Sequence, residues 1–281
     1  MNKLTKEEKT EIIKIVLDSA QIIFETETGS QADLDIEVKG FGDYVTRVDQ
    51  EIQNYIEKEL LKIFPEHQFL GEEGERHSFD QTKPCWILDP IDGTTNLVWD
   101  IQHSAISLAY WNGLDLDFGV IYDPFLDELF VASRGEGAKL IQAAKRNYPK
   151  QTKLDLKMRE LQELSQAIVA FGSAPYGRGT DIDHKVVFEV LSDVFFATED
   201  VRRFGSAALD LSYIAADRFQ IFYEPTLSPW DFAAGILIVE EAGGVVTDFK
   251  GQAIDIFQPS SIVSANPVLH KKFLPLLERL T

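Results

Sequence analysis

The segment from Trp86 to Asp100, WILDPIDGTTNLVWD, places two aspartates three residues apart at the end of an apolar run. At this spacing, Asp89 and Asp92 would repel each other unless protons or cations lay between them. Carboxylate, carbonyl and water oxygens are the ligands that hard divalent cations such as Mg²⁺ prefer. Since side chains and ligands meet in a crevice at the strand ends of α/β proteins, the segment is a candidate metal site.

Gly93, Thr94 and Thr95 follow directly and open a predicted helix. The free N–H groups and the positive dipole end of such a helix favour an anion. Metal ligands beside an anion site indicate a phosphate site. An Asp-Gly turn followed by an ordinary helix cap would account for the same residues, and the segment alone leaves both interpretations open.

Other acidic residues have ordinary structural explanations as well. Glu72 and Glu73 in LGEEG are typical of a solvated loop. Asp49 stands three residues after Thr46, which fits a capping arrangement at a helix start. Asp231 falls in the first turn of a predicted helix, where a carboxylate is stabilising. Taken singly, each of these residues is more typical of structure than of catalysis.

Several other classes of chemistry have little support in the sequence. The five histidines are scattered without metal-ligand spacing, and the single cysteine, Cys85, excludes an intrachain disulfide and a multi-cysteine zinc site. The serines lack the context of a nucleophile elbow, and no P-loop occurs.

Composition narrows the range of partners. The 281 residues carry a formal net charge of −19, from 46 acidic and 27 basic side chains. This charge argues against nucleic acid or an anionic membrane as the main partner, but a metal ion can still bring in a small phosphorylated ligand. The charged N-terminus does not resemble a signal peptide, and no apolar run reaches membrane-spanning length. We therefore expect a cytoplasmic globular protein.

Hydrophobic periodicity predicts the elements that must position these residues. It favours helices over residues 6–28 and from Thr46 to Pro65, and a short strand that runs into an acidic turn in HQFLGEEG. Further strands are expected in PCWILD, AISLAYWNG and DFGVIYDP, followed by a hairpin turning at residues 135–137. The strand of Asp89 is expected to end at that residue. Polar residues 141–162 suggest a boundary between two halves, residues 1–145 and 146–281. The second half alternates strands and helices, with Gly243 expected to cap the helix that begins near Pro229, and the whole pattern predicts a layered α/β architecture.

Five segments taken together resemble the inositol monophosphatase family, a group of magnesium-dependent, lithium-sensitive sugar phosphatases related to fructose-1,6-bisphosphatase. They occur in the family's order between residues 42 and 244: GDYVTRVD, FLGEEG, WILDPIDGTTN, GSAALDLSYIAA and SPWDFAAGILIVEEAGG. The resemblance implies a layered α-β-α-β-α sandwich. In it an N-terminal α+β half carries most metal ligands, and a C-terminal α/β half carries substrate contacts and the last ligand. It also implies a homodimer.

The resemblance implies a role for each matching residue. Two to three Mg²⁺ ions would be held by Glu72, Asp89, the carbonyl of Ile91, Asp92 and Asp231. Asp49 and Thr94 would activate a water bound by the ions, with Glu72 assisting the catalysis through the weakest ion. The phosphate would rest on the N–H groups of Gly93 and Thr94, and the hydroxylated ring would meet Ser206, Ala207 and Glu224.

The implied reaction is hydrolysis of inositol monophosphate or a similar small polyol phosphate. Relatives with the same metal motifs act on fructose 1,6-bisphosphate, NADP or 3'-phosphoadenosine 5'-phosphate, so these esters are the alternatives. A regulator that binds a sugar phosphate without turning it over is a third interpretation, which the complete ligand set disfavours. Inhibition by Li⁺ is also implied.

The sequence departs from the family pattern next to the metal motif. Leu97 replaces the usual phenylalanine, Gln102 replaces proline, and Trp99 and Asp100 replace a histidine and a basic residue. Lys39 stands one residue closer to Asp49 than the lysine on the mobile loop of some members. These changes leave the metal ligands intact and concern the substrate rim.

Overall fold

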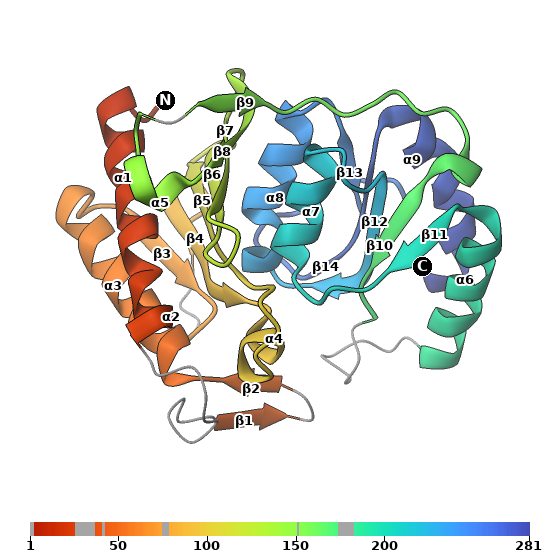
Figure 1. The fold of residues 1–281 in the computed structure, drawn as a ribbon, viewed down its shortest axis with the longest axis horizontal. Coiled ribbons are helices and arrows are strands. Elements are labelled where there is room, and N and C mark those ends of the chain that lie inside the picture. Colours follow the sequence, from red (N-terminus) through yellow and green to blue (C-terminus); the bar gives the residue numbers. More distant parts are fainter. Residues whose placement is uncertain (1–2, 26–36, 41–42, 75–78, 151, 174–182) are drawn as a thin grey trace.

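The computed structural model describes residues 3–25, 37–40, 43–74, 79–150, 152–173 and 183–281. A seven-stranded sheet forms the N-terminal half, and its strands lie in sequence order (Figure 1). The first pair is parallel and the remaining pairs are antiparallel. The strands are β3 (Gln68–Gly71), β4 (Pro84–Asp92), β5 (Ala105–Asn112), β6 (Leu116–Asp123), β7 (Glu128–Ser133), β8 (Gly137–Gln142) and β9 (Lys153–Asp155).

A five-stranded sheet forms the C-terminal half. Its strand order is β11-β10-β12-β14-β13. Strand β10 is parallel to β11 and β12, and β14 is antiparallel to β12 and β13. The strands are β10 (Ile168–Phe171), β11 (Asp200–Arg202), β12 (Ile221–Leu227), β13 (Val245–Thr247) and β14 (Ser260–Ala265). A small hairpin, β1 (Glu37–Gly40) and β2 (Asp43–Val45), lies apart from both sheets.

Helices complete the layers. On the outer face of the first sheet lie α1 (Lys6–Ser19), α2 (Gln21–Glu25) and α3 (Arg47–Ile63). Between the two sheets lie α7 (Ala207–Ala215) and α8 (Pro229–Glu241), and on the outer face of the second sheet lie α6 (His184–Ala197), α9 (Pro267–Phe273) and the 3₁₀ helix η3 (Leu274–Leu280). Short helices occupy the connections: α4 (Thr94–Val98), α5 (Ala144–Asn147) and η2 (Leu164–Gln166). The structure thus confirms the α-β-α-β-α order.

Burial explains why the strand that carries the acidic pair reads as an unbroken apolar run. Strand β4 lies inside the sheet, with α3 on one face and α8 on the other. Every residue from Cys85 to Asp92 is buried. A strand covered on both faces has no solvent side for polar residues, so the alternation typical of half-exposed strands is lost.

Three boundaries differ from the sequence predictions. The first helix is interrupted at Ala20, and its expected end at Thr28 lies outside the described residues. Strand β4 runs on to Asp92 instead of ending at Asp89, with an irregular register opposite β5 because Pro90 cannot donate to the ladder. Ala242 caps α8, and Gly243 follows with a φ of 91°.

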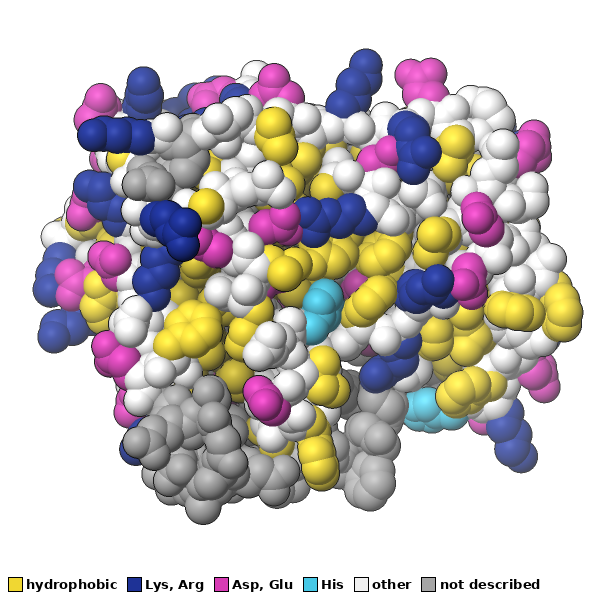
Figure 2. Space-filling model, viewed as in Figure 1, with side chains coloured by type: hydrophobic (Ala, Val, Ile, Leu, Met, Phe, Trp, Pro, Cys, Tyr) yellow, Lys and Arg dark blue, Asp and Glu magenta, His cyan; other side chains and the backbone are white. Residues whose placement is uncertain are grey.

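Two further expectations concern the division of the chain into halves and the absence of a membrane-spanning segment. Strand β9 pairs with β8, so the first sheet draws on residues up to Asp155, and the division of the chain at residue 145 stays a prediction. None of the described helices is long and apolar enough to cross a membrane. On the face drawn in Figure 2, acidic and basic side chains are interspersed.

Candidate active site

Three aspartates from two elements meet between the sheets. Asp89 and Asp92 come from the end of β4, and Asp231 comes from the first turn of α8. Each offers one oxygen to a group whose oxygens all lie within 4.8 Å of one another, and all three residues are less than 10% exposed. The fold thus brings together carboxylates that are more than a hundred residues apart in the chain.

The negative charges of these carboxyl groups repel one another. The pKa of Asp89 lies well above its usual range because the group is buried and because Glu72, Asp92 and Asp231 face it. Burial, followed by the charge of Asp231, raises the pKa of Asp92 to about 7, although hydrogen bonds from the start of α7 act in the other direction. A buried cluster of oxygen donors with excess negative charge fits a hard divalent cation, which would relieve the repulsion.

One oxygen of each aspartate is fixed by a hydrogen bond from the protein. Asp89 Oδ1 accepts from the N–H of Ile91 at 3.0 Å. Asp231 Oδ2 accepts from the N–H of Ser228 at 2.7 Å, as the third residue of a capping box. The capping interpretation and the metal interpretation of Asp231 therefore describe the same side chain.

Glu72 and Ile91 reach the cluster from neighbouring segments. Glu72 follows β3, and its N–H donates to Leu88 O on β4 at 3.1 Å. Its carboxyl is close enough to share a hydrogen bond with Asp89. The carbonyl of Ile91 accepts from Thr94 Oγ1 at 2.9 Å. The parallel pairing of β3 with β4 thus places the LGEEG loop beside Asp89.

Asp49 and Thr94 form a second polar pair at the edge of the cluster. Thr94 Oγ1 donates to Asp49 Oδ1 at 3.1 Å, while Asp49 Oδ2 accepts from the N–H of Thr46 at 2.8 Å and from its hydroxyl at 2.5 Å. Asp49 is fully buried. Burial raises its pKa to about 6 against the effect of these hydrogen bonds. A carboxyl group with such a pKa can exchange a proton near neutral pH.

The turn between β4 and α4 is held from several sides. Gly93 has a φ of 94°, and a Cβ there would lie 3.1 Å from His103 O, so the position favours glycine. Ser104 Oγ donates to Gly93 O at 2.9 Å. Asn96 Nδ2 donates to His103 O and to Phe204 O, at 2.7 and 2.8 Å. The sequence interpretation assigned no role to Asn96 or Ser104, because these contacts form only once the turn and the segment around Phe204 have folded together.

The residues expected at the substrate lie on the C-terminal side of the cluster. Ser206 Oγ and the N–H of Ala208 donate to Asp92 Oδ2, at 2.5 and 2.7 Å, and Ala207 contributes a backbone hydrogen bond as well. Ser206 therefore orients Asp92 across the two halves of the molecule. This contact was not expected from the sequence.

Glu224 lies in β12 against the end of β10. A Cβ on Gly172 would lie 1.9 Å from Glu224 Cδ, so this glycine leaves the room that the carboxyl occupies. Asp210 on α7 is a further buried carboxyl that the sequence interpretation missed. Burial, Glu224 and Asp92 raise its pKa well above the usual range. The side chain of Lys39 lies outside the described part of the chain.

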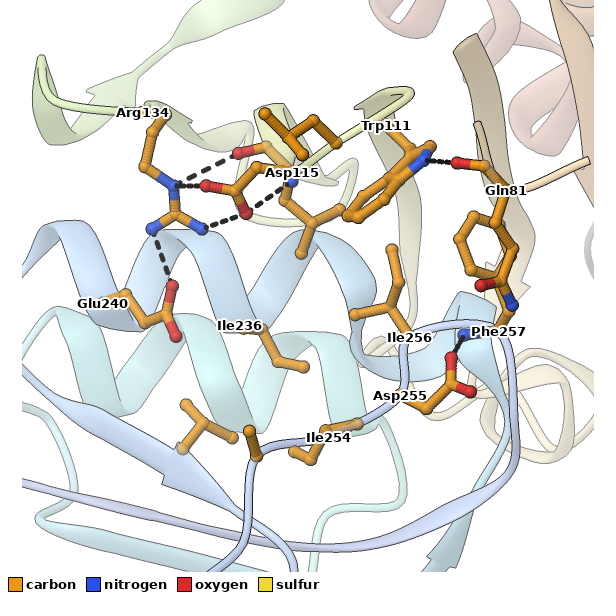
Figure 3. Close-up of a pocket in the computed structure, with 14 residues that line it drawn as sticks. Gln81, Trp111, Asp115, Arg134, Ile236, Glu240, Ile254, Asp255, Ile256 and Phe257 are labelled. Atoms are coloured by element: carbon orange, nitrogen blue, oxygen red, sulfur yellow. Dashed lines mark hydrogen bonds and ion pairs between the residues drawn. The ribbon is translucent and has the colours of Figure 1, made fainter. Parts of the chain in front are cut away.

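A separate cavity of about 320 Å³ lies at the other end of β5 and α8 (Figure 3). Arg134 bridges the halves there, with Asp115 Oδ2 at 3.0 Å and Glu240 Oε2 at 2.7 Å. The Trp111 indole N–H donates to Gln81 O at 2.7 Å. The Arg134–Glu240 ion pair joins the two halves at the end of α8 opposite Asp231.

Comparison with known proteins places this geometry in context. The model of the inositol monophosphatase family matches residues 5–281. The chain is 37% identical over 251 residues to an inositol-1-monophosphatase of Rhizobium meliloti, covering 89% of each chain. It is 39% identical over 230 residues to the Nus factor SuhB of Vibrio cholerae, covering 82% of this chain and 80% of that one.

Solved structures show the same fold. The extragenic suppressor protein suhB of Bartonella henselae superposes with a TM-score of 0.83 at 34% identity, covering 95% of this chain and 96% of that one. A staphylococcal inositol monophosphatase-1, in an inhibitory complex soaked with LiCl, also superposes with a TM-score of 0.83, at 26% identity, covering 99% of this chain and 97% of that one.

Proposed function

Because this chain belongs to the inositol monophosphatase family, we propose that it is a Mg²⁺-dependent phosphatase that hydrolyses inositol monophosphate or a similar small polyol phosphate. The observation that carries the proposal is the buried cluster of Asp89, Asp92 and Asp231, whose oxygens lie within 4.8 Å of one another. Only a bound cation compensates so much buried negative charge without protonating it.

Two to three Mg²⁺ ions are the proposed cofactors. Glu72, Asp89 and the carbonyl of Ile91 would hold one ion, Asp89, Asp92 and Asp231 a second, and Glu72 a weaker third. When bound, such ions neutralise the phosphate ester and lower the pKa of water. The fixed oxygens of the aspartates keep the site in shape before an ion arrives.

The Asp49–Thr94 pair would accept the proton of the attacking water. The Thr94 hydroxyl donates to Asp49 Oδ1, so it can accept a proton from the attacking water as its own proton passes to Asp49. Glu72, beside Asp89, would assist. The carboxylate form of Asp49 is the active one.

The rest of the substrate would meet groups from both halves. The backbone N–H groups of Gly93 and Thr94 are the proposed phosphate contacts, and Ser206, Ala207 and Glu224 the proposed contacts of the hydroxylated ring. A carboxyl group such as that of Glu224 accepts hydrogen bonds, so this position suits a substrate with hydroxyl donors.

Phosphate release from inositol 1-phosphate tests the proposal. We expect turnover with Mg²⁺, none after its removal by chelation, and loss of activity in Asp89→Asn. Asp155→Asn, on the exposed strand β9, is the control and should match the wild type. Activity that survives in Asp89→Asn would rule out this mechanism.

The same site with another ester is the alternative within the proposal. Catalytic efficiencies on fructose 1,6-bisphosphate, NADP and 3'-phosphoadenosine 5'-phosphate, measured beside inositol 1-phosphate, identify the preferred substrate. If one of these esters has the highest kcat/KM, the inositol assignment is wrong while the metal mechanism stands.

A regulatory role is the second candidate, because a relative 39% identical to this chain is named Nus factor SuhB. The net charge of −19 argues against a nucleic-acid partner. Binding of the purified protein to RNA and DNA at low and physiological salt tests that expectation. A regulator without catalysis would show no phosphate release in the substrate panel.

Three further properties belong to the proposal: a cytoplasmic location, a homodimer and inhibition by Li⁺. Exposed apolar side chains beside the site, Trp99 at 60% and Ile101 at 51%, favour association with a second copy. Light scattering after size exclusion measures the mass. Li⁺ titration of phosphate release tests inhibition, which is named for the staphylococcal complex.

A further inference from the structure

The side-chain amide of Gln53 on α3 pairs with the backbone of Glu73. Gln53 Nε2 donates to Glu73 O at 2.6 Å, and the N–H of Glu73 donates to Gln53 Oε1 at 3.0 Å. Gln53 is only 8% exposed. The amide thus satisfies both backbone groups of one residue, as a neighbouring strand would do.

The chain before Glu72 is shaped to receive the same amide. A Cβ on Gly71, the last residue of β3, would lie 2.2 Å from Gln53 Oε1 and 2.8 Å from Gln53 Nε2. Any larger residue would push the amide away. Gln53 therefore contacts the chain on both sides of Glu72, at Gly71 by packing and at Glu73 by hydrogen bonds.

Helix α3 connects this contact to the rest of the site. Asp49, which accepts from Thr94, stands one turn before Gln53 on the same helix, and residues four apart lie on the same face. Glu72, held between the two contacts, donates its N–H to Leu88 O at 3.1 Å, and its carboxyl faces Asp89. One helix thus sets the positions of the Asp49–Thr94 pair and of the loop that brings Glu72 to the acidic cluster.

We propose that Gln53 is a positioning residue for cation binding. Its amide holds the turn from Gly71 to Glu73 against α3, so that the Glu72 carboxylate is in place beside Asp89 before an ion binds. Gln53 itself touches neither ion nor substrate. Without the amide, the turn has to be ordered at the expense of binding free energy, and loss of such a supporting partner typically weakens metal binding by about 10- to 100-fold.

The test compares Gln53→Met, which keeps the length of the side chain and removes both hydrogen bonds, with the wild type. The Mg²⁺ concentration for half-maximal phosphate release should rise by about 10- to 100-fold. At saturating Mg²⁺, kcat should stay within about twofold, since the Asp49–Thr94 pair is untouched. Gln50→Met, an exposed glutamine on the same helix, is the matched control and should leave both values unchanged.

A second variant reaches the same contact from the other side. Gly71→Ala should raise the Mg²⁺ midpoint, the concentration for half-maximal phosphate release, in the same way. The double variant with Gln53→Met should show little further increase, because both changes remove the same contact. If Gln53→Met does not fold, Gly71→Ala carries the test. A fall in kcat with an unchanged Mg²⁺ midpoint, or no change in either value, would overturn the proposal.

The turnover readout rests on the proposed function, so a second measurement is independent of it. Calorimetric titration of Mg²⁺ into substrate-free protein should show the same 10- to 100-fold weakening in Gln53→Met. If the wild type hydrolyses none of the esters, the proposed function fails while this titration still tests Gln53. Equal Mg²⁺ affinity of Gln53→Met and wild type in the titration would overturn the role of Gln53.

Discussion

At the scale of residues, the site is organised by carboxylates with one oxygen fixed and the other turned to a neighbour. Asp49 shows this most fully, because Thr46 holds Oδ2 while Thr94 contacts Oδ1. Asp49 belongs both to the capping box of α3 and to the candidate site, and Asp231 does the same at the start of α8. Structural and functional explanations of such residues are therefore not exclusive.

The titration of Asp49 gives a prediction about pH. Its pKa is about 6, and only its ionised form can accept the proton, so activity should fall as the pH drops through about 6. The profile of kcat from pH 5 to 8 at saturating Mg²⁺ measures this. Asp49→Asn should lower kcat by about 10²- to 10⁴-fold and abolish the fall of kcat on the acidic side of the pH profile. If kcat of Asp49→Asn still falls at acidic pH, the titration of another group causes that fall.

At the scale of elements, the residue after β10, Gly172, leaves room for the side chain of Glu224 in the middle of β12. Gly172→Ala would put a Cβ 1.9 Å from Glu224 Cδ, so the carboxyl has to move. We expect KM for the substrate to rise about tenfold or more, as for loss of one hydrogen bond to a charged group, with an unchanged Mg²⁺ midpoint.

A double variant separates displacement of Glu224 from general damage to the strand. In a Glu224→Ala background, Gly172→Ala should add no further increase in KM. Additive increases in KM would show that the glycine acts through something other than Glu224.

At the scale of the whole molecule, stability depends on what neutralises the buried aspartates. The pKa of Asp89 is strongly raised and that of Asp92 is about 7, so without cations their contribution to stability is present at low pH and is lost as the pH rises through these values. Mg²⁺, the proposed cofactor, would take the place of the protons.

The increase in Tm on adding Mg²⁺ should therefore be larger at pH 8 than at pH 6. Thermal unfolding of the metal-free and Mg²⁺-loaded protein at both pH values measures it. Asp89→Asn, which removes one charge from the cluster, should reduce the difference between the two pH values. An equal increase at both pH values would contradict the competition between protons and Mg²⁺.

The sequence by itself determined the acidic motifs, the two large helices near the N-terminus, the buried strand before Asp89 and the layered fold, because these depend on local periodicity and on letters close together in the chain. Only the tertiary structure decided that Ser206 orients Asp92, that Gly172 makes room for Glu224 and that Gln53 holds the turn around Glu72. Such contacts join residues that lie 18 to 114 positions apart. Their geometry depends on how the sheets and helices pack, and no local pattern of residues encodes that packing.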